Sequence, residues 1–190
     1  MPRAGLSPDA VVDLALAVVD DGGARGYDDL TLAAVASRAG VAVPSLYKHV
    51  AGLPALRREV ARVCIDDFTA TLERARDEHP DGPEVLRAMA TAVRAYARRS
   101  PGRYAAVQGA GWADDADAAA VREAGARSVR VVSEALAAAG ADTSVDAVRS
   151  FRAALHGFVR LELDGGFGMP DDVDGSFDHL VRLLVDGLTR

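Results

Sequence analysis

Apolar residues recur at intervals of three and four along most of this chain, which is the spacing of one face of an α-helix. Gly, Pro, Ser, Thr and Asp residues of the kinds that begin and end helices lie between these segments. The pattern predicts about nine helices. They are expected at residues 8–21 after the candidate cap Ser7, at 31–39 and 43–49, then from Pro54 to near His79, between Pro83 and Ser100, in a short segment holding Tyr104, Val107 and Trp112, and from Asp117 to Ala139. The last two are expected from a cap at Thr143 or Ser144 through Leu161, and from after a Gly165–Gly175 loop to Leu188.

Composition favours an all-α fold. Aromatic residues make up only 5% of the 190 residues, whereas strands favour aromatic and β-branched side chains. The length and the hydrophobic content of 49% fit a folded protein with a sizeable core. We expect an N-terminal three-helix bundle over residues 1–52 and a larger helical domain over residues 53–190. The long helix after residue 52 would span roughly 35–40 Å and connect the two.

Residues 31–50, TLAAVASRAGVAVPSLYKHV, predict two short helices joined by a tight turn at Gly40-Val41. Gly40 suits the left-handed position that ends a helix. The second helix is too short to be a core element and ends in a polar tip. Lys48 in that tip is the only lysine in the chain, since the other 21 fixed positive charges are arginines. A helix-turn-helix that inserts its second helix into the major groove of DNA explains this arrangement.

The net charge of −6 argues at first against a nucleic-acid partner. The acidic excess lies mainly after residue 60, because residues 1–60 carry six basic and seven acidic residues. Residues 30–58 contain four basic residues and His49 but no carboxylate. We therefore expect a local positive patch to bind double-stranded DNA.

The predicted DNA-binding residues divide by chemistry. Small or apolar side chains at the start of the second helix permit close approach and contact with bases, and Ser45 can bond to a base or a phosphate. The polar residues of the tip, and a threonine at a helix N-terminus, would position the protein on phosphates. Two residues keep a structural alternative, in which Thr31 is only a helix cap and Tyr47 is a packing residue. The predicted set is Thr31, Ala42, Val43, Pro44, Ser45, Tyr47, Lys48 and His49.

The last two expected helices carry more apolar surface than one buried stripe requires. Two interpretations compete: a hairpin buried in a monomer, or a hairpin that pairs with its copy across a two-fold axis, which we favour because a terminal hairpin has few neighbours in its own chain. The predicted dimer residues are Phe151, Leu155, Phe158, Leu180, Leu184 and Leu188.

A small-molecule pocket would need aromatic walls and a few polar groups. Candidate residues in the C-terminal domain are Met89, Tyr96, Tyr104, Gln108, Trp112 and His156. His156 also fits a structural role, because Leu155 and Phe158 flank it on an apolar helix.

No catalytic or metal-binding pattern is visible. The four histidines lack metal-ligand spacing, and the sequence has no phosphate loop and no nucleophile motif. We expect no enzymatic activity, no metal and no cofactor. The single cysteine, Cys64, fits a small apolar core residue better than a redox switch. No apolar run approaches a membrane span and no secretion signal is visible, so we expect a cytoplasmic protein.

Residues 8–60, and especially LTLAAVASRAGVAVPSLYKHVAGLPAL at 30–56, resemble the DNA-binding domain of TetR-family transcriptional regulators. LHGFVRLELDGGFGMP at 155–170 resembles the C-terminal class named for a Trp-His-Gly signature, although Arg152 stands about where its tryptophan is expected. Two positions depart from the family pattern: Leu53 replaces a frequent phosphate-contacting lysine, and Ala42 replaces a frequent serine.

The resemblance implies a homodimeric, all-helical regulator that reads an operator and binds a small-molecule inducer. Our leading hypothesis is a repressor of a palindromic operator, with its two reading helices about 34–36 Å apart. The alternative is a helical sensor or binding protein that acts through protein–protein contact.

Overall fold

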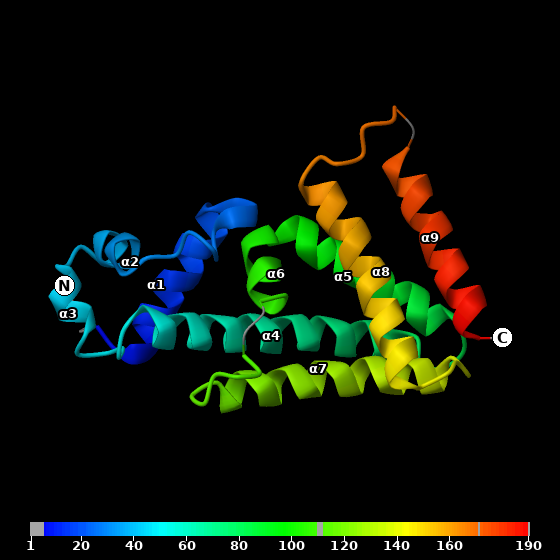
Figure 1. Cartoon of the computed structure of the whole chain (residues 1–190), viewed down its shortest axis with the longest axis horizontal. Helices are drawn as coiled ribbons and strands as arrows, with labels where there is room; N and C mark the ends of the chain where they lie inside the picture. The colour runs from blue at the N-terminus through cyan, green and yellow to red at the C-terminus, as the bar shows by residue number, and fades with distance from the viewer. Residues whose placement is uncertain (1–5, 110–111, 171, 190) are drawn as a thin grey trace. The chain divides into compact units, whose positions relative to one another are not determined.

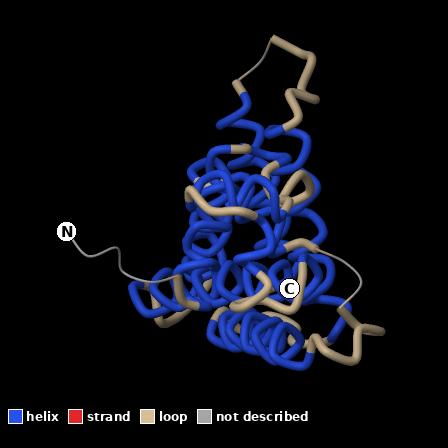
Figure 2. The backbone as a smooth tube through the Cα atoms, turned by 90° about the vertical axis from the view of Figure 1, so that its left-hand side faces the viewer, coloured by secondary structure: helices blue, strands red, loops and turns tan. Residues whose placement is uncertain are grey.

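The computed structural model describes residues 6–109, 112–170 and 172–189. Over these ranges the regular structure is entirely helical (Figures 1 and 2). The all-α prediction is therefore confirmed. The elements are α1 (Pro8–Asp21), the 3₁₀ turn η1 (Gly23–Arg25), α2 (Leu32–Ala39), α3 (Val43–Leu46), α4 (Leu53–Glu78), α5 (Glu84–Arg99), α6 (Pro101–Val107), α7 (Ala119–Ala138), α8 (Val145–Leu163) and α9 (Val173–Leu188).

Several predicted helix ends are confirmed by their capping bonds. The Ser7 hydroxyl oxygen accepts from the Ala10 amide at 3.1 Å, and Thr31 Oγ1 accepts from the Ala34 amide at 3.1 Å. Ser144 Oγ accepts from the Ala147 amide at 3.2 Å. These bonds satisfy amides that have no partner inside the helix. Gly40 has φ of 68°, the left-handed conformation expected of it.

Three predicted boundaries are wrong. The helix expected at 43–49 ends at Leu46 and is followed by a turn at residues 47–49, where the Leu46 carbonyl accepts from the amides of His49 and Val50. Trp112 lies outside α6, which ends at Val107. α9 begins at Val173, inside the expected loop, because the Asp172 side chain caps it.

The described chain packs as two compact units. One contains residues 1–66 and 100–124, and the other contains residues 67–99 and 125–190. The unit that holds the helix-turn-helix therefore extends past residue 52. The first part of α4 belongs to it because Leu56, Val60 and Cys64 are fully buried in its core. The functional boundary after residue 52 stays a prediction.

The core of the first unit joins α1, α2 and α3 to α4, α6 and the start of α7. Its fully buried members include Val11, Val19, Leu30, Val35, Leu46, Leu56, Val60, Cys64 and Ala106. Each such Val or Leu side chain contributes about 1.5–3 kcal/mol relative to an exposed one. Cys64 is also buried in this core, which agrees with its interpretation as a small apolar core residue.

The second unit contains α5, α8 and α9 together with the later parts of α4 and α7. α8 and α9 form an antiparallel hairpin, and each contacts α5 (Figure 1). Phe68 of α4 meets Tyr96 of α5 edge to face, with ring centroids 5.2 Å apart. Phe158 of α8 meets Phe177 of α9 in the same way at 5.2 Å. Aromatic pairs of this geometry add roughly 0.5–1.5 kcal/mol beyond their buried area.

Candidate nucleic-acid interface

Two backbone hydrogen bonds close the C-terminus of α2 at the turn that leads to α3. The Gly40 amide donates to the Ser37 carbonyl at 3.1 Å, and the Val41 amide donates to the Ala36 carbonyl at 3.0 Å. This arrangement requires a left-handed residue, and glycine adopts it without steric cost. It brings α3 back against α2, which it contacts.

The buried side chain of Leu46 sets the orientation of α3. Leu46 is 0% exposed and is anchored in the core of the first unit. Tyr47, the residue that follows it, is 59% exposed, so it is not a packing residue. The remaining predicted DNA-contact residues of this segment are exposed (Ala42, Pro44, Lys48) or half-buried (Val43, Ser45, His49). The local geometry thus leaves this short helix and its polar tip open to a large partner.

Thr31 stands at the start of α2, where it is exposed and acts as the N-cap. Its hydroxyl oxygen accepts the Ala34 amide, and the hydroxyl hydrogen remains a donor. The capping role and a phosphate contact are therefore compatible.

The positive patch is not free of carboxylates, which corrects the expectation from sequence. Arg38 forms an ion pair with Asp21 at the end of α1. Arg58 pairs with Asp115 at 3.0 Å and with Asp117 at 3.4 Å. These carboxylates lie 17, 57 and 59 positions from their partners, so a local charge count missed them.

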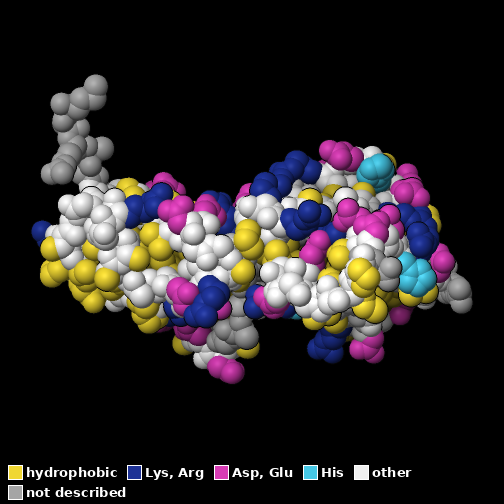
Figure 3. Space-filling model, turned by 90° about the horizontal axis from the view of Figure 1, so that it is seen from above, with side chains coloured by type: hydrophobic (Ala, Val, Ile, Leu, Met, Phe, Trp, Pro, Cys, Tyr) yellow, Lys and Arg dark blue, Asp and Glu magenta, His cyan; other side chains and the backbone are white. Residues whose placement is uncertain are grey.

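Lys48 differs from the arginines of the same segment. Its side chain is exposed, and among the described residues that side chain makes neither a hydrogen bond nor an ion pair. Arg57, in contrast, is directed at backbone carbonyls. On the face that Figure 3 shows, basic and acidic side chains are intermixed and form no continuous basic surface. Lys48 therefore carries a positive charge that no carboxylate of the described chain pairs with, unlike Arg38 and Arg58.

Leu53, which replaces the frequent lysine of the family pattern, begins α4 and packs against the core of the first unit. It offers a phosphate neither charge nor hydrogen bond.

The six candidate ligand residues are divided between the two compact units. Tyr104, Gln108 and Trp112 belong to the first unit, whereas Met89, Tyr96 and His156 belong to the second. Met89 and Tyr96 are fully buried core residues. The indole N–H of Trp112 is buried and has no acceptor among the described residues. A single site made from all six stays a prediction.

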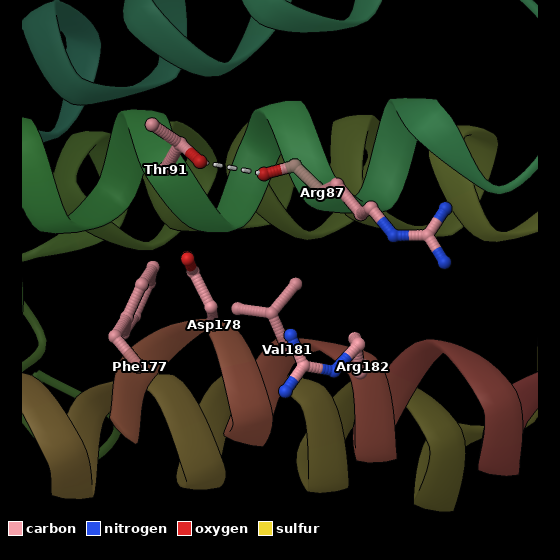
Figure 4. A pocket seen from close by; sticks show the side chains of 6 residues that line it. All are labelled: Arg87, Thr91, Phe177, Asp178, Val181 and Arg182. Atoms are coloured by element: carbon pink, nitrogen blue, oxygen red, sulfur yellow. Dashed lines mark hydrogen bonds between the residues drawn. The ribbon is translucent and has the colours of Figure 1, made fainter. Parts of the chain in front are cut away.

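A groove of about 360 Å³ lies between α5 and α9, and none of these six residues lines it. Figure 4 shows the side chains that line it. Its walls combine charged and apolar side chains: Arg87, Thr91, Phe177, Asp178, Val181 and Arg182.

Two predicted dimer residues are buried within the chain itself. Phe151 and Leu155 are each 2% exposed and lie in the core of the second unit, because that face of α8 packs inside its own chain. Phe158, Leu180, Leu184 and Leu188 are half-buried. Leu161 and Leu183, which are not among the predicted dimer residues, are 50% and 59% exposed.

The described part of the chain contains no group of three or more His, Cys, Asp or Glu side chains that could hold a metal ion. A search of the same residues finds no helix with the length and hydropathy needed to cross a membrane.

The fold and the exposed α2–α3 motif define an all-helical, helix-turn-helix transcriptional regulator. The model of the tetR family of bacterial regulatory proteins matches residues 23–50, and the model of the tetracyclin repressor-like C-terminal domain matches residues 86–184. The chain belongs to the TetR family of transcriptional regulators, with a DNA-binding helix-turn-helix and a ligand-binding C-terminal domain.

Known proteins agree with this assignment. The chain is 38% identical to Rv0681, an uncharacterized HTH-type transcriptional regulator of Mycobacterium tuberculosis, over 98% of this chain and 84% of that one. The solved structure of a protein with unknown function from Rhodococcus sp. RHA1 has a TM-score of 0.78 and 26% identity, with 100% of both chains covered. The TetR-family regulator PfmR from Thermus thermophilus shares the fold, with a TM-score of 0.68 and 17% identity over 98% of this chain and 100% of that one.

Proposed function

We propose that this regulator is a repressor that binds a palindromic operator as a homodimer and is released by a small-molecule inducer. The observation that carries the proposal is the contrast within α3 and its tip, where Leu46 is fully buried and Tyr47 and Lys48 are exposed. A short helix anchored by a buried leucine, with an exposed polar tip, suits insertion into a major groove.

The contacts divide into two kinds. Val43 and Pro44 offer apolar contact, most naturally to a thymine methyl group, and Ser45 offers a hydrogen bond to a base edge or a phosphate. Lys48, Tyr47, His49 and Thr31 hold phosphates. Because Arg38 and Arg58 are paired with carboxylates and Leu53 carries no charge, much of the salt-dependent affinity falls to Lys48.

The apolar surface of the α8–α9 hairpin supports pairing with a second copy. Leu161 and Leu183 are large and exposed, and Leu180, Leu184 and Leu188 remain partly exposed. A two-fold dimer repeats one surface on both partners, and two α3 helices about 34–36 Å apart read two half-sites of a palindrome. An inducer that binds a dimer of different spacing more tightly lowers operator affinity.

A titration of the protein against fluorescent duplexes from the DNA flanking its own gene tests the proposal, with a scrambled duplex of equal length as control. We expect saturable binding at low salt with two chains per duplex, measured by anisotropy and light scattering. Candidate small molecules added to the complex should then release the DNA. A dimeric, folded protein that prefers none of these duplexes to the scrambled control would contradict the repressor and favour a role in protein–protein contact.

A further inference from the structure

The segment that leads into α2 is held from α4 in addition to its local hydrogen bonds. Arg57 Nη2 donates to the carbonyl oxygen of Asp28 at 2.7 Å and to that of Leu30 at 3.3 Å. In return, the Tyr27 hydroxyl donates to the carbonyl oxygen of Arg57 at 3.1 Å. Four residues of sequence are thus fixed to the second turn of a helix that lies about thirty positions away in the chain.

The contacts of the Arg57 side chain are made with the segment before α2. Its guanidinium lies over the Tyr27 ring at 5.8 Å, and Nε is buried with no acceptor among the described residues. Its hydrogen bonds in the described chain go to carbonyls and none to a carboxylate. Burial raises the pKa of Tyr27, so its hydroxyl stays protonated as a donor at neutral pH.

The fork of an arginine is suited to this contact. A guanidinium presents several N–H groups in a fixed plane and can also stack on an aromatic ring, whereas a lysine ammonium is a compact point charge. Leu30, whose carbonyl Arg57 holds, directly precedes Thr31, the cap of α2. A shift of this segment moves the Thr31 hydroxyl and the first amides of α2 together.

We propose that Arg57 is a positioning residue for DNA binding, which sets the start of α2 against α4 without contacting DNA itself. This inference rests on the proposed function. A typical hydrogen bond has a donor–acceptor distance of about 2.9 Å, so a displacement of about 1 Å at Thr31 moves a phosphate contact out of hydrogen-bonding range. The replacement of the phosphate-contacting lysine by Leu53 makes the protein depend more on the α2 end of the interface.

The test uses Arg57→Ala and Arg57→Lys, with Arg62→Ala as the matched control. Arg62 lies on the same helix and forms exposed ion pairs with Glu59 and Asp66 at 3.0 and 2.9 Å. Operator affinity is measured across a salt series. We expect both Arg57 variants to bind about tenfold more weakly, with the salt slope of the wild type, and Arg62→Ala to bind normally.

A direct phosphate contact gives the opposite pattern: Arg57→Ala flattens the slope by about 0.9 unit, and Arg57→Lys, which keeps the charge, binds nearly as well as the wild type. Either that pattern or undiminished binding by folded Arg57→Ala overturns the proposal.

Tyr27→Phe provides a second test if Arg57→Ala does not fold, because it removes one hydrogen bond and keeps the ring. Amide hydrogen exchange of residues 28–34 in the DNA-free protein should accelerate in this variant and stay unchanged in Arg62→Ala. Unchanged exchange with Tyr27→Phe overturns the positioning role. This readout needs no DNA, so it separates failure of the inference from failure of the wild type to bind an operator.

Discussion

Arg94 of α5 forms a two-bond ion pair with Glu162 of α8, with N–O distances of 2.9 and 2.6 Å. The two side chains are 11% and 17% exposed. The same guanidinium donates to Asp174 of α9 at 2.6 Å and lies over the Phe177 ring at 4.7 Å. The hydrogen bond to Glu162, followed by that to Asp174, raises the pKa of Arg94. One side chain therefore joins α5, α8 and α9.

Replacement of Arg94 by Ala should lower the free energy of unfolding by about 3 kcal/mol. It leaves the Glu162 carboxylate poorly solvated and without hydrogen bonds from Arg94, with only the longer ion pair to Arg98, at 3.9 Å, to balance its charge. Urea denaturation measures this loss. Adding Glu162→Gln should recover part of it by removing the poorly solvated charge. The control is Arg160→Ala, which breaks an ion pair to Asp164 that is half exposed on both sides and should cost under about 1 kcal/mol. Equal losses in Arg94→Ala and Arg160→Ala would contradict the role of burial.

Replacement of Lys48 by Ala should weaken operator binding and flatten its dependence on log salt by about 0.9 unit, since one phosphate contact is lost. Fluorescence anisotropy over a range of salt concentrations provides both quantities. Lys48→Arg keeps the charge and should retain the slope. If Lys48→Ala leaves slope and affinity unchanged, Lys48 is outside the interface.

Replacement of Gly102 by Ala should destabilise the first unit by about 1–3 kcal/mol, because the added carbon overpacks the contact between α6 and α1. A Cβ at Gly102 would lie 2.4 Å from the Val19 carbonyl oxygen and 2.7 Å from that of Gly23. At Gly125 of α7 a Cβ meets nothing within 4 Å, so Ala there should stabilise the helix by about 0.5–1 kcal/mol. Thermal unfolding distinguishes the two, and a stabilising Gly102→Ala would show that α6 and α1 are not in such close contact.

His156 should make the stability of the protein depend on pH near neutrality. Burial, and then the charges of Arg152 and Arg160, lower the pKa of His156. The unfolded chain therefore binds this proton at higher pH than the folded chain does, so the free energy of unfolding falls as pH drops below about 6.5, toward the lowered pKa of the folded state.

Urea denaturation of the wild type and His156→Gln between about pH 8 and pH 5 isolates this contribution. The wild type should lose stability relative to the variant as the pH falls, and His179→Gln, at an exposed position, serves as control. A difference between wild type and His156→Gln that is constant with pH would contradict the prediction.

The predictions from sequence succeeded where structure depends on residues a few positions apart. The caps Ser7, Thr31 and Ser144 each bond to an amide three residues ahead, and Gly40 needs only its own backbone conformation. The end of α3 was misplaced because it depends on how the chain must turn to reach α4. The DNA-contact residues stay a prediction, although the exposure of Tyr47 and Lys48 is now known.

The sequence by itself determined the helical class, the helix-turn-helix motif and the unusual position of the lone lysine, because periodicity, capping and composition are local properties. Only the tertiary structure decided that Arg38 and Arg58 are paired with carboxylates, that Phe151 and Leu155 face inward, and that Arg57 holds the segment before α2. These relationships join residues separated by many positions, or depend on which face of a helix is covered. Packing of the folded chain sets them, and no local pattern encodes them.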